Sequence, residues 1–455
     1  MTFRTVNPAD EEVIRRFDAL TDDELDERLA RASRAFESYR ETELEERSRW
    51  LLAAADRLES GAEAHGRLMT IEMGKPIGQA VAEVRKCARV CRYYAERGAD
   101  FLAGQVVETD ARRSEVRYRP LGPVLAVMPW NFPFWQVFRF AAPALMAGNV
   151  ALLKHAPNVP QCALALEGVF NRAGFPEDVF QNLFATERQV ADLLGDPRLR
   201  AATLTGSVGA GSAVASIAGR EIKKTVLELG GSDPFVVLAD ADLDAALETA
   251  VRARTQNSGQ SCIAAKRFVV AEEIADAFTE GLTERFEALV VGDPLDPDTD
   301  VGPLARADLR ERLASQVDDT AAAGARVLTG GSVPEGRGWY YPPTVLTGAP
   351  AGSPAADEEL FGPVATVFRA EDPAAALEIA NRTRFGLGAS VWTRDEAEQN
   401  RFAAELEVGT VAINGMVASD PRVPFGGVKD SGYGRELGPH GIREFMNVQV
   451  VHWSP

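Results

Sequence analysis

The chain has 455 residues, of which 45% are apolar and 25% charged, so it is long enough for two or three packed domains. Its 49 basic and 67 acidic residues give a net charge of -18, which disfavours nucleic acid and anionic membrane surfaces as partners. Four cysteines are too few for a disulfide scaffold, and the N-terminus lacks a secretory signal pattern. The longest uncharged run, 120–138, contains four prolines and is not expected to span a membrane. We therefore expect a cytoplasmic protein.

The first part of the chain predicts helices. Residues 21–60 carry apolar side chains at helical spacing, and Thr21 with Glu24 has the pattern of a capping box. A second helix is expected over 78–98. Residues 106–120 alternate as a hairpin does, and the final segment 446–453 alternates in the same way. These two ribbons either pair across subunits or form surface hairpins.

From residue 123 onward the pattern changes. Short apolar runs alternate with helical stretches for four rounds, which predicts a parallel sheet covered by helices on both faces. A second alternation of strand and helix starts near Asp233, with helices expected over 243–256 and 274–291. The fold class is therefore α/β. In such sheets, ligands bind at the carboxyl ends of the strands.

Cysteine is the best lead to chemistry. The four histidines lack metal-ligand spacing with another His or Cys, so no metal site is expected. Cys87, Cys91 and Cys162 lie on apolar helical stretches and are expected to be core thiols. Cys262 differs because it lies in SGQSCIAAKR, where small neighbours leave the sulfur accessible. It is a candidate nucleophile, although a lone cysteine is weak evidence.

A nucleophile needs a base and a group that accepts negative charge. Glu228 ends an apolar strand in TVLELGG, where burial would raise its pKa toward the range of a base; a solvent-facing carboxylate is the alternative. Asn131 lies in MPWNFP, where its amide either binds an oxyanion or forms a turn.

Two further segments are candidate cofactor contacts. TGSVGAG at 205–211 precedes a helix whose N–H groups could bind phosphate, although its glycine order is not the usual dinucleotide fingerprint. Lys154 ends an expected strand, where a cation suits a ribose or a phosphate.

Seven segments occur in order along the chain: MPWNFP, LLKHAP, TGSVGAG, ELGGSDP, GQSCIAAKR, EELFGPV and PFGGVKDSGYGRE. Together they resemble motifs of the aldehyde dehydrogenase superfamily over essentially the whole chain. The resemblance implies that Cys262 attacks an aldehyde carbon, that Asn131 holds the oxyanion, and that Glu228 activates water to release the acid. The cofactor contacts that it implies are Trp130, Lys154, Gly206, Ser207, Glu359 and Phe361.

The resemblance also implies a domain organisation. A Rossmann-like cofactor domain is expected over 1–103 and 122–229, and an α/β catalytic domain over 230–427. A β-ribbon oligomerisation arm is expected over 104–121 and 428–455. Homodimers or homotetramers are typical of the family.

One departure from the family bears on the cofactor. Many relatives that prefer NAD carry K-P-x-E, whereas residues 154–157 here read KHAP and lack the carboxylate. Its loss removes repulsion of a 2′-phosphate, with which Lys154 could pair. We therefore expect NADP to be preferred, with NAD possible.

The substrate expected is a short ω-carboxy aldehyde. The KHA segment with NVP after it, and ASDPRVPFGG, look similar to bacterial succinate-semialdehyde dehydrogenases, which favours succinate semialdehyde. Arg139, eight residues after Asn131, is expected to bind the distal carboxylate with help from Ser419 and Arg422. A helix-surface arginine is the alternative.

Other functions stay open. A broad-specificity aliphatic or aromatic aldehyde dehydrogenase is one, and a non-catalytic binding relative is a remote one. CoA-acylating relatives usually lack the glutamate, so Glu228 disfavours that reaction. A cysteine hydrolase would want a histidine base, and the sequence offers no local candidate. Ala264 stands where some relatives carry a second cysteine, so no local disulfide switch is expected.

Overall fold

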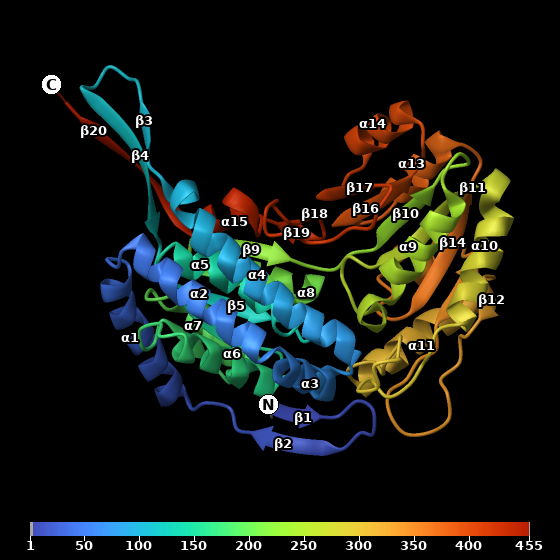
Figure 1. Cartoon of the computed structure of the whole chain (residues 1–455), viewed down its shortest axis with the longest axis horizontal. Helices are drawn as coiled ribbons and strands as arrows, with labels where there is room; N and C mark the ends of the chain where they lie inside the picture. The colour runs from blue at the N-terminus through green and yellow to red at the C-terminus, as the bar shows by residue number, and fades with distance from the viewer. Residues whose placement is uncertain (1–2, 455) are drawn as a thin grey trace.

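The computed structural model describes residues 3–454, which form two lobes and a projecting ribbon (Figure 1). An N-terminal hairpin, absent from the sequence predictions, pairs β1 (Phe3–Val6) with β2 (Val13–Phe17). Four helices follow: α1 (Asp22–Tyr39), α2 (Leu44–Ser60), α3 (Ala62–Met73) and α4 (Ile77–Leu102). Of these, α3 was not predicted, and α4 confirms the helix expected over 78–98.

The segment 21–60, expected as one helix, forms the two helices α1 and α2. Buried Arg47 on α2 donates hydrogen bonds to the carbonyl groups of Tyr39 (3.2 Å) and Arg40 (2.9 Å) at the end of α1. The last carbonyl groups of a helix have no intrahelical partner, so this guanidinium stabilises the break. The capping box predicted at Thr21 is confirmed.

The first lobe is built on a six-stranded sheet of order β19-β9-β8-β5-β6-β7, in which only β19 is antiparallel to its neighbour. This confirms the four predicted rounds of strand and helix. The strands are β5 (Pro123–Met128), β6 (Val150–His155), β7 (Phe180–Asn182), β8 (Ala201–Thr205), β9 (Lys224–Glu228) and β19 (Gly432–Tyr433). The helices between them are α5 (Trp135–Met146), α6 (Pro160–Arg172), α7 (Glu187–Gly195) and α8 (Val208–Arg220).

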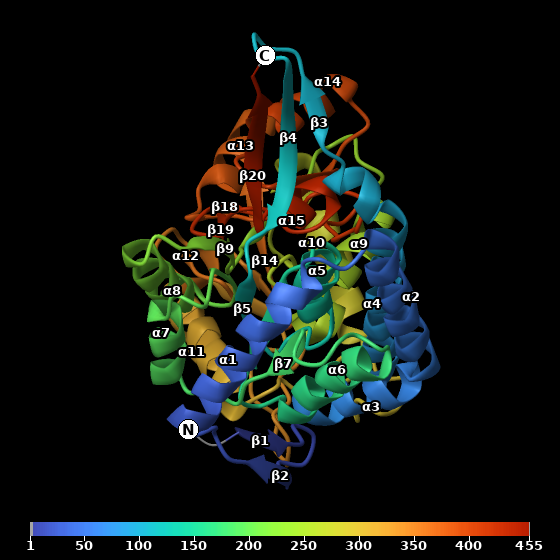
Figure 2. The same cartoon turned by 90° about the vertical axis from the view of Figure 1, so that its left-hand side faces the viewer.

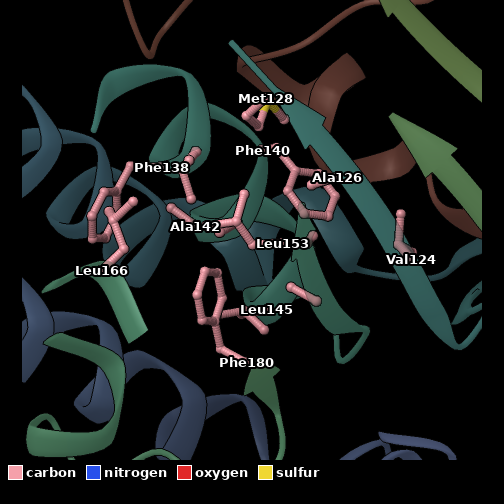
Figure 3. Packing of buried hydrophobic residues seen from close by; sticks show 14 of the residues in the cluster. Val124, Ala126, Met128, Phe138, Phe140, Ala142, Leu145, Leu153, Leu166 and Phe180 are labelled. Atoms are coloured by element: carbon pink, nitrogen blue, oxygen red, sulfur yellow. The ribbon is translucent and has the colours of Figure 1, made fainter. Parts of the chain in front are cut away.

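Helix α5 lies in the centre of this lobe. All of its residues are buried, because the sheet covers one side and α4 with α2 covers another. Figure 3 shows Phe140 and Leu145 of α5 beside Ala126 of β5 and Leu153 of β6. A helix enclosed in this way has little freedom to shift, so the loop that enters it is held firmly.

The second lobe contains a seven-stranded sheet of order β12-β13-β14-β11-β10-β16-β17, parallel except for β12 (Figure 1). Its strands are β10 (Asp233–Val237), β11 (Ala265–Ala271), β12 (Arg326–Thr329), β13 (Thr344–Thr347), β14 (Val364–Ala370), β16 (Gly388–Trp392) and β17 (Thr410–Ile413). Its helices are α9 (Leu243–Thr255), the 3-10 helix η1 (Gln256–Gly259), α10 (Glu272–Glu287), α11 (Ala307–Ala322), α12 (Pro354–Asp357), α13 (Pro373–Asn381) and α14 (Glu396–Glu405). The predicted second alternation is confirmed. Within residues 3–454, no helix has the length and apolarity needed to cross a bilayer.

The projecting ribbon joins β3 (Gln105–Val107), β4 (Arg113–Pro120) and β20 (Met446–Trp453) in antiparallel order β20-β4-β3 (Figures 1 and 2). The two predicted alternating segments thus pair with each other. Of the segment 428–455, only β20 joins this ribbon. The earlier part returns to the lobes: β18 (Val428–Lys429) pairs with β15 (Phe385–Gly386), β19 pairs with β9, and α15 (Gly438–Arg443) packs on α4 and α5.

Candidate active site

The loop that joins β5 to α5 is fixed by a buried carboxylate. Glu83 on α4 accepts hydrogen bonds from the backbone N–H groups of Phe134 and Trp135, both at 2.9 Å. The first turn of a helix leaves such N–H groups without intrahelical partners. The other oxygen of Glu83 forms a buried ion pair with Lys75, whose ammonium lies 3.9 Å from the centre of the Phe132 ring. These contacts anchor the loop to α4.

A second anchor of this loop is His155, the last residue of β6. Its Nε2 donates to the carbonyl of Pro133 at 2.9 Å, and its Nδ1 accepts from the N–H of Ala156 at 2.9 Å. Burial lowers the pKa of His155 to about 4, so the imidazole is neutral at neutral pH. The histidine after Lys154 in the KHA segment is therefore a structural link to the loop.

Asn131 lies in this loop, and hydrogen bonds orient its amide from both sides. Its Nδ2 donates to the carbonyl of Gln260 at 3.0 Å, and its Oδ1 accepts from Gln136 Nε2 at 3.1 Å. The backbone carbonyl of Asn131 also accepts a hydrogen bond from Asn257 Nδ2 at 2.7 Å. Asn131 lines the same cavity as Cys262. A fixed amide with a second N–H left to donate is what an oxyanion site requires.

Cys262 lies in a turn between η1 and β11 that needs unusual backbone angles. Asn257, Ser258 and Gly259 all have positive φ, at 55°, 53° and 76°. Glycine is required at 259 because a Cβ there would lie 2.2 Å from the carbonyl oxygen of Gly362. Such backbone conformations are strained, and they cluster at functional sites. Here the turn brings the sulfur into the cavity.

A buried lysine supports this turn. Lys266 Nζ donates to the carbonyl groups of Ser261 at 2.8 Å and Cys262 at 2.6 Å, and it lies 3.6 Å from the Glu359 carboxylate. Glu359 also accepts from the N–H of Gly231 at 3.0 Å. One ammonium therefore connects the candidate nucleophile with a candidate cofactor contact.

Glu228 is buried, and Cys262 is partly buried. Burial raises the pKa of Cys262 to about 12, although the positive charges of Arg139 and Lys266 oppose the shift. Burial also raises the pKa of the Glu228 carboxyl well above its usual value. Burial thus disfavours both the thiolate form of Cys262 and the carboxylate form of Glu228.

Glu228 does not line the cavity of Cys262, although its charge is near enough to raise the pKa of the thiol. The Glu228 carboxylate lies beside Gly426, where an added Cβ would be 2.7 Å from Oε1. Neither carboxylate oxygen has a hydrogen-bond partner within residues 3–454. Leu229 and Gly230, rather than Glu228, line the cavity that contains Cys262.

Arg139, the expected ligand of a substrate carboxylate, lies in the core rather than on a helix surface. Arg139 is buried and forms an ion pair with Glu436. Its guanidinium also donates to Thr205 Oγ1 at 3.4 Å and lies 4.6 Å from the centre of the Phe425 ring. Loss of either partner would leave an uncompensated charge in the core. Glu436 was not singled out from the sequence, because its only signal was its place in the GYGRE segment.

Five of the six predicted cofactor residues line the cavity that contains Cys262, namely Trp130, Gly206, Ser207, Glu359 and Phe361. The Trp130 and Phe361 rings meet edge to face, with their centres 5.8 Å apart. The structure thus gathers these residues from three distant segments around the cavity of Cys262.

The residues of this cavity fit a nicotinamide dinucleotide. Ser207 caps α8, where it accepts from the N–H of Ala210 at 3.3 Å, and the remaining N–H groups of that turn are suited to phosphate. The backbone is open at Gly209, where an added Cβ would meet no atom within 4 Å. Glu359 supplies a carboxylate that can accept from ribose hydroxyls.

Lys154, the sixth predicted residue, is not part of this lining. It lies at the carboxyl end of β6 with 7% of its surface exposed. Burial lowers its pKa, which the negative charge of Glu187 on α7 opposes.

A second cavity, of 560 Å³, is lined in part by Phe132 of the loop between β5 and α5 and by Trp135 of α5. It is lined by Lys75, Gln79, Ala82, Glu83, Lys86, Phe132, Trp135, Glu248, Val251, Arg252, Thr255, Gln256, Leu289, Asp300 and Met416. Ser419 contacts two of these lining residues, since its Oγ accepts from Lys86 Nζ at 2.7 Å and from Trp135 Nε1 at 3.0 Å. Arg422 instead forms a surface ion pair with Asp420.

Comparisons with known proteins identify the family of this chain. The aldehyde dehydrogenase family model matches residues 1–451. The chain is 56% identical to a Mycobacterium tuberculosis protein named succinate-semialdehyde dehydrogenase [NADP(+)] 1, over 99% of both chains. It is 53% identical to a probable succinate-semialdehyde dehydrogenase [NADP(+)] of Synechocystis, again over 99% of both. A crystal structure of succinic semialdehyde dehydrogenase from Streptococcus pyogenes with NADP+ superposes with a TM-score of 0.98, at 35% identity over 100% of both chains. The chain belongs to the aldehyde dehydrogenase family.

Proposed function

We propose that this protein oxidises succinate semialdehyde to succinate with NADP as the electron acceptor. The observation that carries the proposal is the common cavity of Cys262, Asn131 and the candidate cofactor residues. The substrate and cofactor are supported by full-length relatives above 50% identity, whose names specify succinate semialdehyde and NADP(+).

Cys262 carries the chemistry. Its thiolate adds to the aldehyde carbon, and the resulting oxyanion accepts hydrogen bonds from Asn131 Nδ2 and the backbone N–H of Cys262. The chemistry that a bound nicotinamide dinucleotide supplies is acceptance of the hydride. Oxidation leaves a thioester on Cys262. Water then attacks the thioester carbon, which releases the acid and regenerates the thiolate.

Glu228 is the proposed base for the water step. Its raised pKa suits proton uptake from water at neutral pH, once the carboxyl has given up its own proton. A side-chain rotation away from Gly426 is needed for it to reach the cavity. The absence of hydrogen bonds to its oxygens within residues 3–454 makes that rotation inexpensive, because no such bond has to be broken.

The preference for NADP is supported by the residues that follow β6. Lys154 is retained, and residues 154–157 lack the carboxylate that would repel a 2′-phosphate. Glu359, Phe361, Ser207 and Trp130 remain the proposed contacts for the rest of the dinucleotide.

The ribbon supports a homodimer or homotetramer. Its exposed apolar residues are Val106, Val107, Val448 and Val450, and its edge strand β3 has free backbone groups that another subunit could pair with. We propose domains at 1–103 with 122–229 and at 230–427, and an arm of 104–121 with 428–455 of which β20 is the paired strand. The four free thiols support a cytoplasmic location.

A panel of aldehydes against both cofactors tests the proposal. Succinate semialdehyde with NADP should give the highest kcat/KM, and acid should form without CoA. Cys262→Ala should abolish turnover. Equal kcat/KM for succinate semialdehyde, butanal and benzaldehyde would instead indicate a broad-specificity enzyme, and product formed without a nicotinamide cofactor would indicate a hydrolase.

A further inference from the structure

Lys266 is a buried cation beside Cys262 to which the proposed reaction assigns no role. Its side chain is 2% exposed, and its ammonium lies 3.6 Å from the Glu359 carboxylate. Burial lowers the pKa of Lys266, and the negative charges of Glu359 and Asp233 oppose this shift. A buried charge is costly unless its contacts replace the lost hydration, so the groups that receive this ammonium indicate what it does.

The ammonium of Lys266 holds the two peptide groups on either side of the Cys262 Cα atom. Its Nζ donates to the carbonyl of Ser261 at 2.8 Å and to the carbonyl of Cys262 at 2.6 Å. The Ser261 carbonyl also accepts from the N–H of Ala264 at 3.2 Å. On the chain that crosses between the lobes, a Cβ added to Gly231 would lie 2.6 Å from the Cys262 carbonyl oxygen. The planes of both peptide groups are therefore fixed.

The carbonyl of Ser261 and the N–H of Cys262 belong to the same peptide group. Because a trans peptide is planar, these two groups point in opposite directions. The hydrogen bond from Lys266 to the carbonyl therefore directs the N–H of Cys262 away from the ammonium. This N–H has no backbone hydrogen-bond partner within residues 3–454, and Cys262 lines the same cavity as Asn131. It is thus available as the second oxyanion donor proposed above.

The charge of Lys266 also changes the strength of this donor. Hydrogen bonds in series polarise one another, so an ammonium on the carbonyl oxygen makes the N–H of the same peptide a stronger donor. The gain is largest when the accepting oxygen becomes negative, and it is weakly screened in a buried site. An interaction that strengthens as the oxyanion forms stabilises the transition state more than the bound substrate.

We propose that Lys266 is a positioning residue of the oxyanion site, which orients and polarises the 261–262 peptide so that the N–H of Cys262 binds the oxyanion. This inference rests on the proposed function, since it assumes that the N–H of Cys262 is an oxyanion donor. The role is distinct from the direct attraction between the ammonium and the thiolate, because it acts only when negative charge develops on a substrate oxygen.

The test compares two reactions of the same sulfur. Iodoacetamide alkylates the thiolate at a saturated carbon, with iodide as the leaving group, and no oxyanion forms. With p-nitrophenyl acetate, the thiolate adds to the ester carbonyl, a tetrahedral oxyanion forms, and p-nitrophenolate leaves a thioester on the sulfur. The ratio of the acylation rate constant to the alkylation rate constant cancels the thiolate fraction. Of the four free thiols only Cys262 is not fully buried, and the rates of Cys262→Ala are subtracted as background.

Lys266→Met should lower this ratio about 3- to 10-fold, the rate equivalent of one modest hydrogen bond. Lys266→Gln keeps a donor without the charge and should give an intermediate ratio. Asn131→Ala removes a proposed donor outright and should lower the ratio more, by about 100-fold. Lys223→Met is the matched control. The Lys223 ammonium also donates to two backbone carbonyls, those of Leu194 at 2.6 Å and Asp196 at 2.5 Å, but it follows α8 outside the cavity of Cys262. Its ratio should equal that of the wild type.

Equal slowing of both reactions in the Lys266 variants overturns the proposal, because the ammonium then acts on the thiolate alone. Unchanged rates overturn it as well. If Lys266→Met does not fold, the same ratio in Lys266→Gln decides between these results. Turnover of succinate semialdehyde separates this inference from the proposed function: turnover that survives in Cys262→Ala overturns the function, whereas a wild-type ratio in the Lys266 variants overturns only the role of Lys266.

Discussion

Glu83 and Lys75 form a buried pair whose two members should differ sharply in their effect on stability. Their side chains are 3% and 1% exposed. Glu83 has three partners, since it accepts from the N–H groups of Phe134 and Trp135 as well as from Lys75. Lys75 has Glu83 as its single carboxylate partner within residues 3–454. Glu83 therefore has more partners than Lys75, and substitutions of the two residues should change the free energy of unfolding by different amounts.

The expected magnitudes follow from what each substitution leaves unpaired. Glu83→Leu leaves a buried ammonium without a counter-charge, which costs about 3–5 kcal/mol, and removes the acceptor at the start of α5, for about 0.5–2 kcal/mol more. Lys75→Met leaves a carboxylate that still accepts two backbone hydrogen bonds, so the cost should be about 1–3 kcal/mol. The double variant should cost less than the sum, because it leaves no buried charge unpaired.

Urea unfolding followed by tryptophan fluorescence measures these differences, since Trp135 reports directly on the anchored loop. Glu63→Leu is the control, because Glu63 pairs with Arg85 at the surface and should change stability by less than about 0.5 kcal/mol. The reasoning is refuted if Lys75→Met destabilises as much as Glu83→Leu, or if the two effects add in full.

Three further predictions concern other buried ionisable side chains. Lys266→Met should slow iodoacetamide alkylation of Cys262 across neutral to alkaline pH, because loss of the ammonium raises the thiol pKa further; an unchanged pH–rate profile would contradict this. The His155 pKa is about 4 in the folded protein against 6.5 in the unfolded chain, so its contribution to stability is present above pH 6.5 and is lost as pH falls toward 4. Between pH 7 and pH 5 the wild-type protein should therefore lose about 2 kcal/mol more than His155→Gln, and equal losses in urea unfolding would be the negative result. Arg139→Leu should reduce turnover of succinate semialdehyde and propanal alike, because it leaves Glu436 unpaired in the core; a rise confined to the KM for succinate semialdehyde would restore Arg139 as a carboxylate ligand.

Local patterns in the sequence were enough to predict most of the architecture. Alternation of apolar runs with helical periods identified both sheets. A strand buried on both faces has a continuous run of apolar residues, whereas a helix buried on one face has apolar residues at helical spacing. The N-terminal hairpin and α3 escaped prediction. Strand β2 is almost wholly exposed, so it carries no apolar signal, and α3 has a weakly amphipathic sequence.

The candidate site was predicted in part, and the difference lies in which properties are local. Short motifs marked Cys262, Asn131 and Ser207, because tight turns and helix starts are encoded by adjacent residues. The partners of long side chains are not encoded in this way. Arg139 was expected to face a substrate, and only the packing of α15 against α5 gives it Glu436 as a partner.

The same division applies to Lys86 and Lys266. Each appears in the sequence as one more basic residue on a helix or a strand, with nothing nearby to distinguish it. Contacts between residues far apart along the chain then decide their roles, as when Lys86 meets Ser419 and Lys266 meets Glu359. The sequence by itself therefore determined the fold class and the family of this protein, and it marked Cys262 as the candidate nucleophile. The tertiary structure alone decided which charges are neutralised and which stay available to a ligand, because electrostatic pairing depends on distance in space and not on distance along the chain.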